Sequence, residues 1–341
     1  MPVTAPELLP ALPAQFKAQI EAAVENGPAL DAYVASLEPA RFSSVFLVGC
    51  GGSLFAFAPL RCQLDRSPVP VLTFNSDELV LRRPALLGPG SLVIVSSTRG
   101  ATKETALAAR AARASGATVV GITQDADSIV AAACGHVLLH QGIEAKQVIL
   151  AQLGWSLLKA LGTAPEPEFG QATAALARSP QAFAQAHVEW DDQLAELARA
   201  LHQEPVIYVL GSGPLEGAAQ ILAMCYLQEM QKLHAAAISA GEFLHGPFEV
   251  ITEDVPVILL KGDDATRPMA ERAERFLRQY TAKLWVLDAA ALQLDRMDSA
   301  DRPLVADLVL GSTVLNRIAE HFASQTGRPL TSRRYMWKID Y

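Results

Sequence analysis

The chain has 341 residues, of which 50% are hydrophobic and 19% charged, which is enough apolar sequence for about two domains. A net charge of −8 without any basic run argues against nucleic acid or an anionic membrane as a partner. The longest apolar stretch, residues 148–162, is shorter than the ~20 residues of a membrane span. We expect a small-molecule ligand and a cytoplasmic location, since the N-terminus lacks a signal-peptide pattern and the four scattered cysteines are typical of reduced thiols.

The N-terminal residues leave room for two short helices, which we expect at 6–26 and 29–37. Short, β-branched, continuously apolar runs follow at 45–49, 91–96 and 118–123. Such runs are typical of strands covered on both faces, and Ala/Leu-rich helical stretches lie between them. This alternation predicts an α/β fold with a doubly wound parallel sheet.

The second half of the chain repeats the pattern, with expected strands at 206–213, 255–262 and 283–289. Near-constant offsets between the halves favour duplication of one α/β unit, although two unrelated α/β domains of equal size would give similar spacing. A Pro- and Gly-containing stretch at 163–171 ends the preceding helix and marks a boundary. We therefore expect N-terminal helices in 1–40, a first domain in 41–162, a linker with bridging helices in 163–204, and a second domain in 205–341.

Two loops of the first domain carry groups that suit an anion. Gly51 and Ser53 follow the first expected strand, while Ser97 and Thr102 follow the second. In doubly wound sheets, ligands lie beyond the carboxyl ends of the strands, where hydroxyls and free N–H groups at helix N-termini favour a phosphate. Capping of the next helix is an equally good explanation of Ser97 and Thr102.

A nucleotide site is weakly supported. The glycine-rich turn does not complete G-x-G-x-x-G, because Leu54 stands where the third glycine would be. The acidic residue that binds ribose and the lysine of a Walker motif are also missing from the expected positions.

Four segments together resemble the sugar isomerase (SIS) domain family. They are CGGS at 50–53, SSTRGATKET at 96–105, SAGEFLHGPFEV at 239–250 and TSRRYMWKIDY at 331–341. Within this family the chain is most similar to fructosamine-6-phosphate deglycases, and the resemblance covers nearly the whole chain. It implies two tandem, flavodoxin-like SIS domains, in which the second carries the catalytic residues and the C-terminal tail.

The resemblance also implies which residues form the site. The phosphate of a sugar would be bound by the hydroxyls of Ser97 and Thr102, with help from Ser53 in the first loop. Gly51, Thr98 and Arg99 are further candidates in these two loops, although the sequence departs from the family pattern at Thr98 and at Arg99. Arg99 stands where the family commonly has a serine, and an arginine here either adds a bidentate phosphate contact or points outward.

The general base of the family corresponds to Glu229, sixteen residues before His245. Glu229 interrupts an apolar helical stretch, and burial raises the pKa of a carboxyl toward the range useful for proton transfer. The alternative explanation of Glu229 is that it lies on the exposed face of a helix whose other face is buried. His245 precedes Gly246 and Pro247 at a sharp break, which suits ring opening of a sugar, although a histidine at a helix end is equally common.

Three other candidates carry less weight. His234 is near Glu229 in the sequence and could line its pocket, but we favour an ordinary core or surface histidine. Glu249 either orients His245 or merely ends a helical turn. Glu242 and His245 form E-x-x-H, which in di-iron bundles requires a second copy that this chain lacks. We therefore expect neither a metal nor another cofactor.

The expected activity is cleavage of a 6-phosphofructosyl-amine to glucose 6-phosphate and a free amine or amino acid. The resemblance implies a homodimer or higher oligomer with shared active sites, so that His245 serves either its own or the neighbouring subunit. Alternatives are an aldose–ketose isomerase or an amino-sugar phosphate deaminase on the same scaffold, and a non-catalytic protein that senses sugar phosphates.

Overall fold

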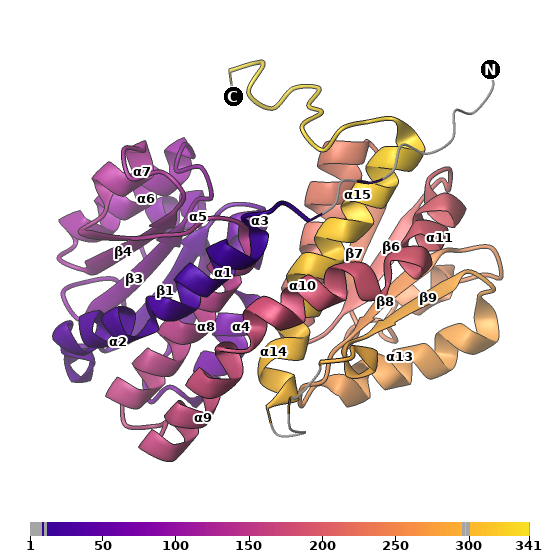
Figure 1. Ribbon diagram of the computed structural model, residues 1–341. Coiled ribbons are helices and arrows are strands. Elements are labelled where there is room, and N and C mark those ends of the chain that lie inside the picture. Colours follow the sequence, from indigo (N-terminus) through magenta and orange to yellow (C-terminus); the bar gives the residue numbers. More distant parts are fainter. Residues whose placement is uncertain (1–8, 10–11, 295–296, 298–300, 341) are drawn as a thin grey trace. The chain divides into compact units, whose positions relative to one another are not determined.

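The computed structural model describes residue 9, residues 12–294, residue 297 and residues 301–340. The chain divides into two compact units, which are described separately here (Figure 1). The N-terminal unit is Gln15–Pro180, and the C-terminal unit is Gln181–Tyr341 together with Met1–Ala14. The division falls inside the segment 163–204 that we expected to be a linker, and helix α10 (Ser179–Glu189) crosses it.

The N-terminal unit alternates strands and helices. Its strands are β1 (Ser44–Gly49), β2 (Val71–Asn75), β3 (Ser91–Ser96), β4 (Thr118–Thr123) and β5 (His136–Leu139). Its helices are α1 (Phe16–Glu25), α2 (Gly27–Ser36), α3 (Gly52–Phe55), α4 (Ala58–Gln63), α5 (Ser76–Arg82), α6 (Lys103–Ala114), α7 (Ile129–Ala133), α8 (Ile143–Ala160) and α9 (Glu166–Leu176), with short 3₁₀ turns η1 (Pro39–Arg41) and η2 (Leu64–Arg66).

The five strands form one parallel sheet in the order β2-β1-β3-β4-β5. This is the flavodoxin-like order of a doubly wound fold. Helices α5, α6 and α7 cover one face, and α1, α2 and α8 pack together on the other (Figure 1). Because both faces are covered, every residue of β1 and β3 is buried, which explains the unbroken apolar runs in the sequence.

The C-terminal unit repeats this plan. Its strands are β6 (Ile207–Gly211), β7 (Ala235–Ser239), β8 (Val257–Lys261) and β9 (Leu284–Asp288). Its helices are α11 (Asp191–Leu201), α12 (Pro214–Gln220), α13 (Arg267–Tyr280), α14 (Arg302–Val309) and α15 (Leu315–Thr326), with π-helices η3 (Ile221–Gln231) and η6 (Leu310–Val314) and 3₁₀ turns η4 (Pro247–Val250) and η5 (Ala289–Ala291).

Its parallel sheet has the order β7-β6-β8-β9, which is the order of the first four strands of the N-terminal unit. Leu277 and the alanines Ala270 and Ala273 of α13 pack with Val257 and Leu259 of β8 in one fully buried cluster. Two tandem doubly wound parallel-sheet units are therefore confirmed.

The six strands expected from the sequence are all present, with ends within two residues of the expected ones. Strands β2, β5 and β7, which we did not expect, are each at a sheet edge. The expected helix 6–26 is wrong at its start, because α1 begins at Phe16 and Pro13 has no N–H to donate; residues 6–8 and 10–11 lie outside the described residues. Among the helices of the described part of the chain, none has the length and apolar character needed to cross a membrane.

Candidate functional site

The first group of candidate residues lies at the carboxyl edge of the N-terminal sheet. Gly49, the last residue of β1, pairs with Ser96, the last residue of β3. The two loops that follow therefore leave the sheet side by side. We call residues 97–102, between β3 and α6, the hydroxyl loop.

The hydroxyls of Ser97 and Thr102 meet within this loop, with 2.9 Å between the Oγ and Oγ1 atoms. Ser97 is buried, at 3% exposed. Thr102 occupies the N-cap position of α6, yet its side chain makes no capping hydrogen bond. Helix capping, the alternative explanation of Thr102, is therefore not what its hydroxyl does.

The glycine turn after β1 closes on the hydroxyl loop. The N–H of Thr98 donates to Oγ of Ser53 at 3.3 Å, and the two hydroxyls lie 3.4 Å apart. Gly51 turns the chain with φ 53°, a conformation that side chains disfavour. Arg99 lies on the same loop and is exposed. Hydroxyls beside the N-terminus of the twelve-residue α6 make a suitable site for an anion, since the helix dipole and unpaired N–H groups favour negative charge.

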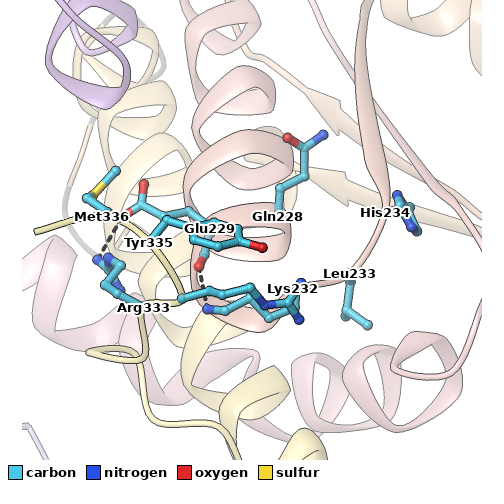
Figure 2. Close-up of a pocket in the computed structure, with 9 residues that line it drawn as sticks. Gln228, Glu229, Lys232, Leu233, His234, Arg333, Tyr335 and Met336 are labelled. Atoms are coloured by element: carbon cyan, nitrogen blue, oxygen red, sulfur yellow. Dashed lines mark hydrogen bonds and ion pairs between the residues drawn. The ribbon is translucent and has the colours of Figure 1, made fainter. Parts of the chain in front are cut away.

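The second candidate region surrounds Glu229 in the C-terminal unit. Glu229 lies near the end of the π-helix η3, a rare helix type that is frequent at functional sites. It lines a cavity of about 520 Å³ between the end of η3 and the C-terminal tail, defined here as residues 327–340 (Figure 2). The lining residues are Gln228, Glu229, Lys232, Leu233, His234, Arg333, Arg334, Tyr335 and Met336.

Lys232 ends this helix. It adopts a left-handed conformation with φ 61°, and its N–H still donates to the carbonyl of Gln228. Its ammonium turns back to the carbonyls of Glu229 and Met230 at 2.6 and 3.1 Å, and also donates to the carbonyl of Ser332 at 2.9 Å. A cation at this helix end satisfies carbonyls that have no partner within the helix.

The carboxylate of Glu229 forms an ion pair with Arg333 of the tail, with 2.7 Å between Oε1 and the guanidinium (Figure 2). Burial raises the pKa of Glu229 above its usual value, while the positive charges of Arg333 and Lys232 act against this rise. A half-buried carboxyl with a raised pKa, facing a cavity, is a candidate general base.

His245 lies elsewhere in this unit. It is exposed, on the turn between β7 and η4, and its N–H donates to the carbonyl of Glu242 at 2.9 Å. It is not among the residues that line the cavity of Glu229, whereas His234 is. Its pairing with Glu229 on one substrate therefore stays a prediction.

Sequence reasoning missed Arg333 and Lys232. Arg333 belongs to the TSRRYMWKIDY segment, for which the resemblance implies no role of any single residue, and Lys232 lies outside the four quoted segments. Nothing in the spacing along the chain indicates that a residue of the tail meets Glu229.

Comparison with known proteins establishes the family. The model of the SIS domain matches residues 37–158 and 200–293, one segment in each half of the chain. The chain belongs to the SIS domain family, as its motifs predicted.

Its relatives include deglycases. The chain is 36% identical over 320 residues to the fructosamine deglycase FrlB of Bacillus subtilis, covering 92% of this chain and 97% of that protein. It is 29% identical to the fructoselysine 6-phosphate deglycase of Escherichia coli K12, over 78% of each chain. A Bacillus subtilis structure described as a phosphosugar isomerase matches with a TM-score of 0.86 and 34% identity, covering 96% of this chain and all of that one.

Proposed function

We propose that this protein is an enzyme that cleaves a 6-phosphofructosyl-amine to glucose 6-phosphate and a free amine or amino acid. The observation that carries the proposal is a half-buried carboxylate, Glu229, that faces a cavity and is held by a cation. The similarity to a fructosamine deglycase over nearly the full length of both chains supports it.

In the proposed reaction, His245, from its own or a neighbouring chain, assists opening of the sugar ring. Glu229 takes a proton from C1 of the open-chain ketoamine while the carbonyl oxygen at C2 gains one, which leaves an enaminol. A proton is then returned at C2 as the amine nitrogen loses its own, so that the double bond lies between C1 and nitrogen. The product is the aldimine of glucose 6-phosphate, and addition of one water molecule releases glucose 6-phosphate and the amine. These steps require no oxidant or reductant.

The phosphate of the substrate is assigned to the hydroxyl loop, with Ser53 and Gly51. Binding at this remote group holds a flexible open-chain sugar and lowers the entropic cost of reaching the transition state. The proposal requires that the hydroxyl loop and Glu229 reach the same substrate molecule, whether within one chain or across two.

The test uses purified protein with fructoselysine 6-phosphate in D₂O. We expect glucose 6-phosphate that carries deuterium at C2, because the carboxyl of Glu229 exchanges its proton with solvent. The change Glu229→Gln keeps the shape and removes the base, so kcat should fall by about 10²- to 10⁴-fold while substrate still binds. Near-normal turnover of this variant would refute the assignment of the base.

The control for this change is Glu196→Gln, at an exposed position of α11 where Glu196 forms an ion pair with Arg199. It should leave kcat unchanged. Glucosamine 6-phosphate serves as the competing substrate: release of ammonia and fructose 6-phosphate from it, with no cleavage of fructoselysine 6-phosphate, would replace the deglycase proposal by an amino-sugar deaminase. Binding of both compounds without turnover would favour the third alternative, a non-catalytic protein that senses sugar phosphates.

A further inference from the structure

The ion pair between the tail and the π-helix points to a role for Arg333. We propose that Arg333 is a positioning residue, whose guanidinium keeps the carboxylate of Glu229 charged and directed into the cavity. This inference rests on the proposed role of Glu229 as the base, and it assigns to the C-terminal tail a part in the chemistry.

The guanidinium of Arg333 is held on several sides. One NH₂ group contacts Oε1 of Glu229 at 2.7 Å, and the other donates to the carbonyls of Leu330 and Ser332 at 2.8 and 2.9 Å. The ring of Trp337 lies 4.9 Å from its central carbon. The Arg333 side chain is only 9% exposed, against 23% for Glu229. A planar cation fixed in this way can orient a carboxylate more strictly than a mobile surface arginine can.

The tail that carries Arg333 is itself fastened to the end of η3. Arg328 donates to the carbonyl of Gln231 at 2.6 Å, and the amide of Gln231 donates back to the carbonyl of Arg328 at 3.1 Å. Lys232 adds the bond to the carbonyl of Ser332. The position of Arg333 relative to Glu229 therefore depends on contacts with the same helix end that carries the base.

The other charged or titratable groups around Glu229 make contacts of their own or line the cavity. The ammonium of Lys232 is directed at backbone carbonyls, and His234, Arg334 and Tyr335 line the cavity. On α15, which packs against η3, Arg317 contacts Asp191 and Glu320, and His321 also contacts Asp191. On α12 the titratable residue is Glu216, while β7 carries none.

Two opposing effects therefore act on the base. Burial favours the protonated carboxyl, which cannot accept a proton from the substrate. The charges of Arg333 and Lys232 favour the carboxylate, and Arg333 also donates a hydrogen bond to it. Without Arg333, Glu229 should stay protonated to a higher pH. The acid limb of the pH profile of kcat/KM, which reports the free enzyme, should then move upward.

The decisive measurement is the titration of Glu229 by NMR of ¹³C-carboxyl-labelled glutamate, with the signal assigned through Glu229→Gln. In Arg333→Gln we expect the apparent pKa of Glu229 to rise by about one unit. The change Arg333→Lys keeps the charge and should restore at least half of this shift. Trp337→Leu removes the stacked ring but not the charge, so a smaller rise is expected, and this variant also serves if Arg333→Gln fails to fold.

The matched control is Arg334→Gln, which removes an exposed cation from the next position of the tail and should leave the titration of Glu229 unchanged. An unchanged titration in Arg333→Gln, or an equal shift in Arg334→Gln, would overturn the proposal. This readout needs no turnover, so the inference is decided even if no Amadori phosphate is cleaved. With an active enzyme, the acid limb of kcat/KM should move with the NMR titration; a uniform loss at every pH would instead indicate a purely structural role.

Discussion

The two units use the same backbone at the carboxyl edge of their sheets but place opposite chemistry on it. After β1 the turn passes through Gly51 with φ 53° and ψ −134°, and after β6 it passes through Gly213 with φ 52° and ψ −126°. In each unit a hydroxyl contact then closes this turn on the next loop. Ser53 meets Thr98 in one unit, and Thr266 donates to Ser212 at 3.1 Å in the other.

The loops after the neighbouring strands differ in charge. The hydroxyl loop after β3 contains Ser97 and Thr102, whereas the loop after β8 contains Asp263 and Asp264. Asp307 of α14 adds a third carboxyl there, and its Oδ1 accepts from the N–H of Asp263 at 2.8 Å. A phosphate dianion suits the first loop and would be repelled by the second. Duplication of a fold therefore need not duplicate its binding site.

The strongest way to break this comparison is to transfer the acidic character to the hydroxyl loop. In Ser97→Asp we expect the dissociation constant of glucose 6-phosphate to rise about 100-fold or more, because placing like charges together costs several kcal/mol. Isothermal titration calorimetry measures the change. Ser97→Asn has the same size without the charge and should weaken binding much less; equal losses in the two variants would show that the phosphate binds elsewhere.

The acidic loop of the C-terminal unit offers a second test, through stability. Burial, together with the charge of Asp264, raises the pKa of Asp307 to about 8, although the N–H of Asp263 opposes the rise. In the unfolded chain an aspartate titrates near 3.9. Between about pH 4 and 8 the folded protein therefore binds more protons than the unfolded chain, and stability should fall as the pH rises through this range.

The change Asp307→Asn removes this group from the titration. We expect the difference in bound protons between the folded and unfolded states to shrink by about one proton in this range. At about 1.4 kcal/mol for each pH unit, the variant should gain about 5 kcal/mol of unfolding free energy relative to the parent between pH 4 and pH 8. Urea unfolding across this range gives both quantities. Asp254→Asn, at an exposed loop position, is the control and should leave the slope as it is. Parallel curves for Asp307→Asn and the parent would contradict the raised pKa.

The smallest expected effect concerns the glycine turn that the two units share after β1 and β6. Gly213→Ala places a Cβ 2.5 Å from Oγ1 of Thr266 on a backbone with positive φ, so we expect a loss of about 1–3 kcal/mol. Gly51→Ala should cost a similar amount, because its dihedral angles are nearly the same. Gly170→Ala, within α9 and with open space around it, should be neutral or slightly stabilising. A loss in Gly213→Ala with none in Gly51→Ala would show that the two turns are not equivalent.

The strands that could be predicted from the sequence are those buried on both faces. Strands such as β3 and β8 are apolar throughout because helices cover both faces, so their pattern is unmistakable. The edge strand β7 has the sequence AAAIS, and such an alanine-rich sequence is typical of a helix. Its pairing with β6, which cannot be predicted from the sequence, makes it a strand.

The candidate site could be predicted only where residues lie in recognisable segments. Glu229 was assigned through the resemblance to the SIS family, in which the base precedes the histidine by sixteen residues, and Ser97 and Thr102 were assigned by their place after a strand. The contact of Arg333 with Glu229 depends on the path of an irregular tail, and the neighbourhood of Asp307 depends on how α14 packs. Neither leaves a periodic pattern in the sequence.

The π-helix that carries Glu229 makes the site sensitive to residue count as well as residue type. The backbone hydrogen bonds of η3 span five residues, one more than the four of an α-helix. Deleting a single residue within it would favour the α-helical hydrogen-bond ring, which closes one residue earlier, and so would change the register of Glu229 against the tail. A one-codon loss in this stretch should therefore weaken the pairing of the base with its arginine even though both side chains are kept.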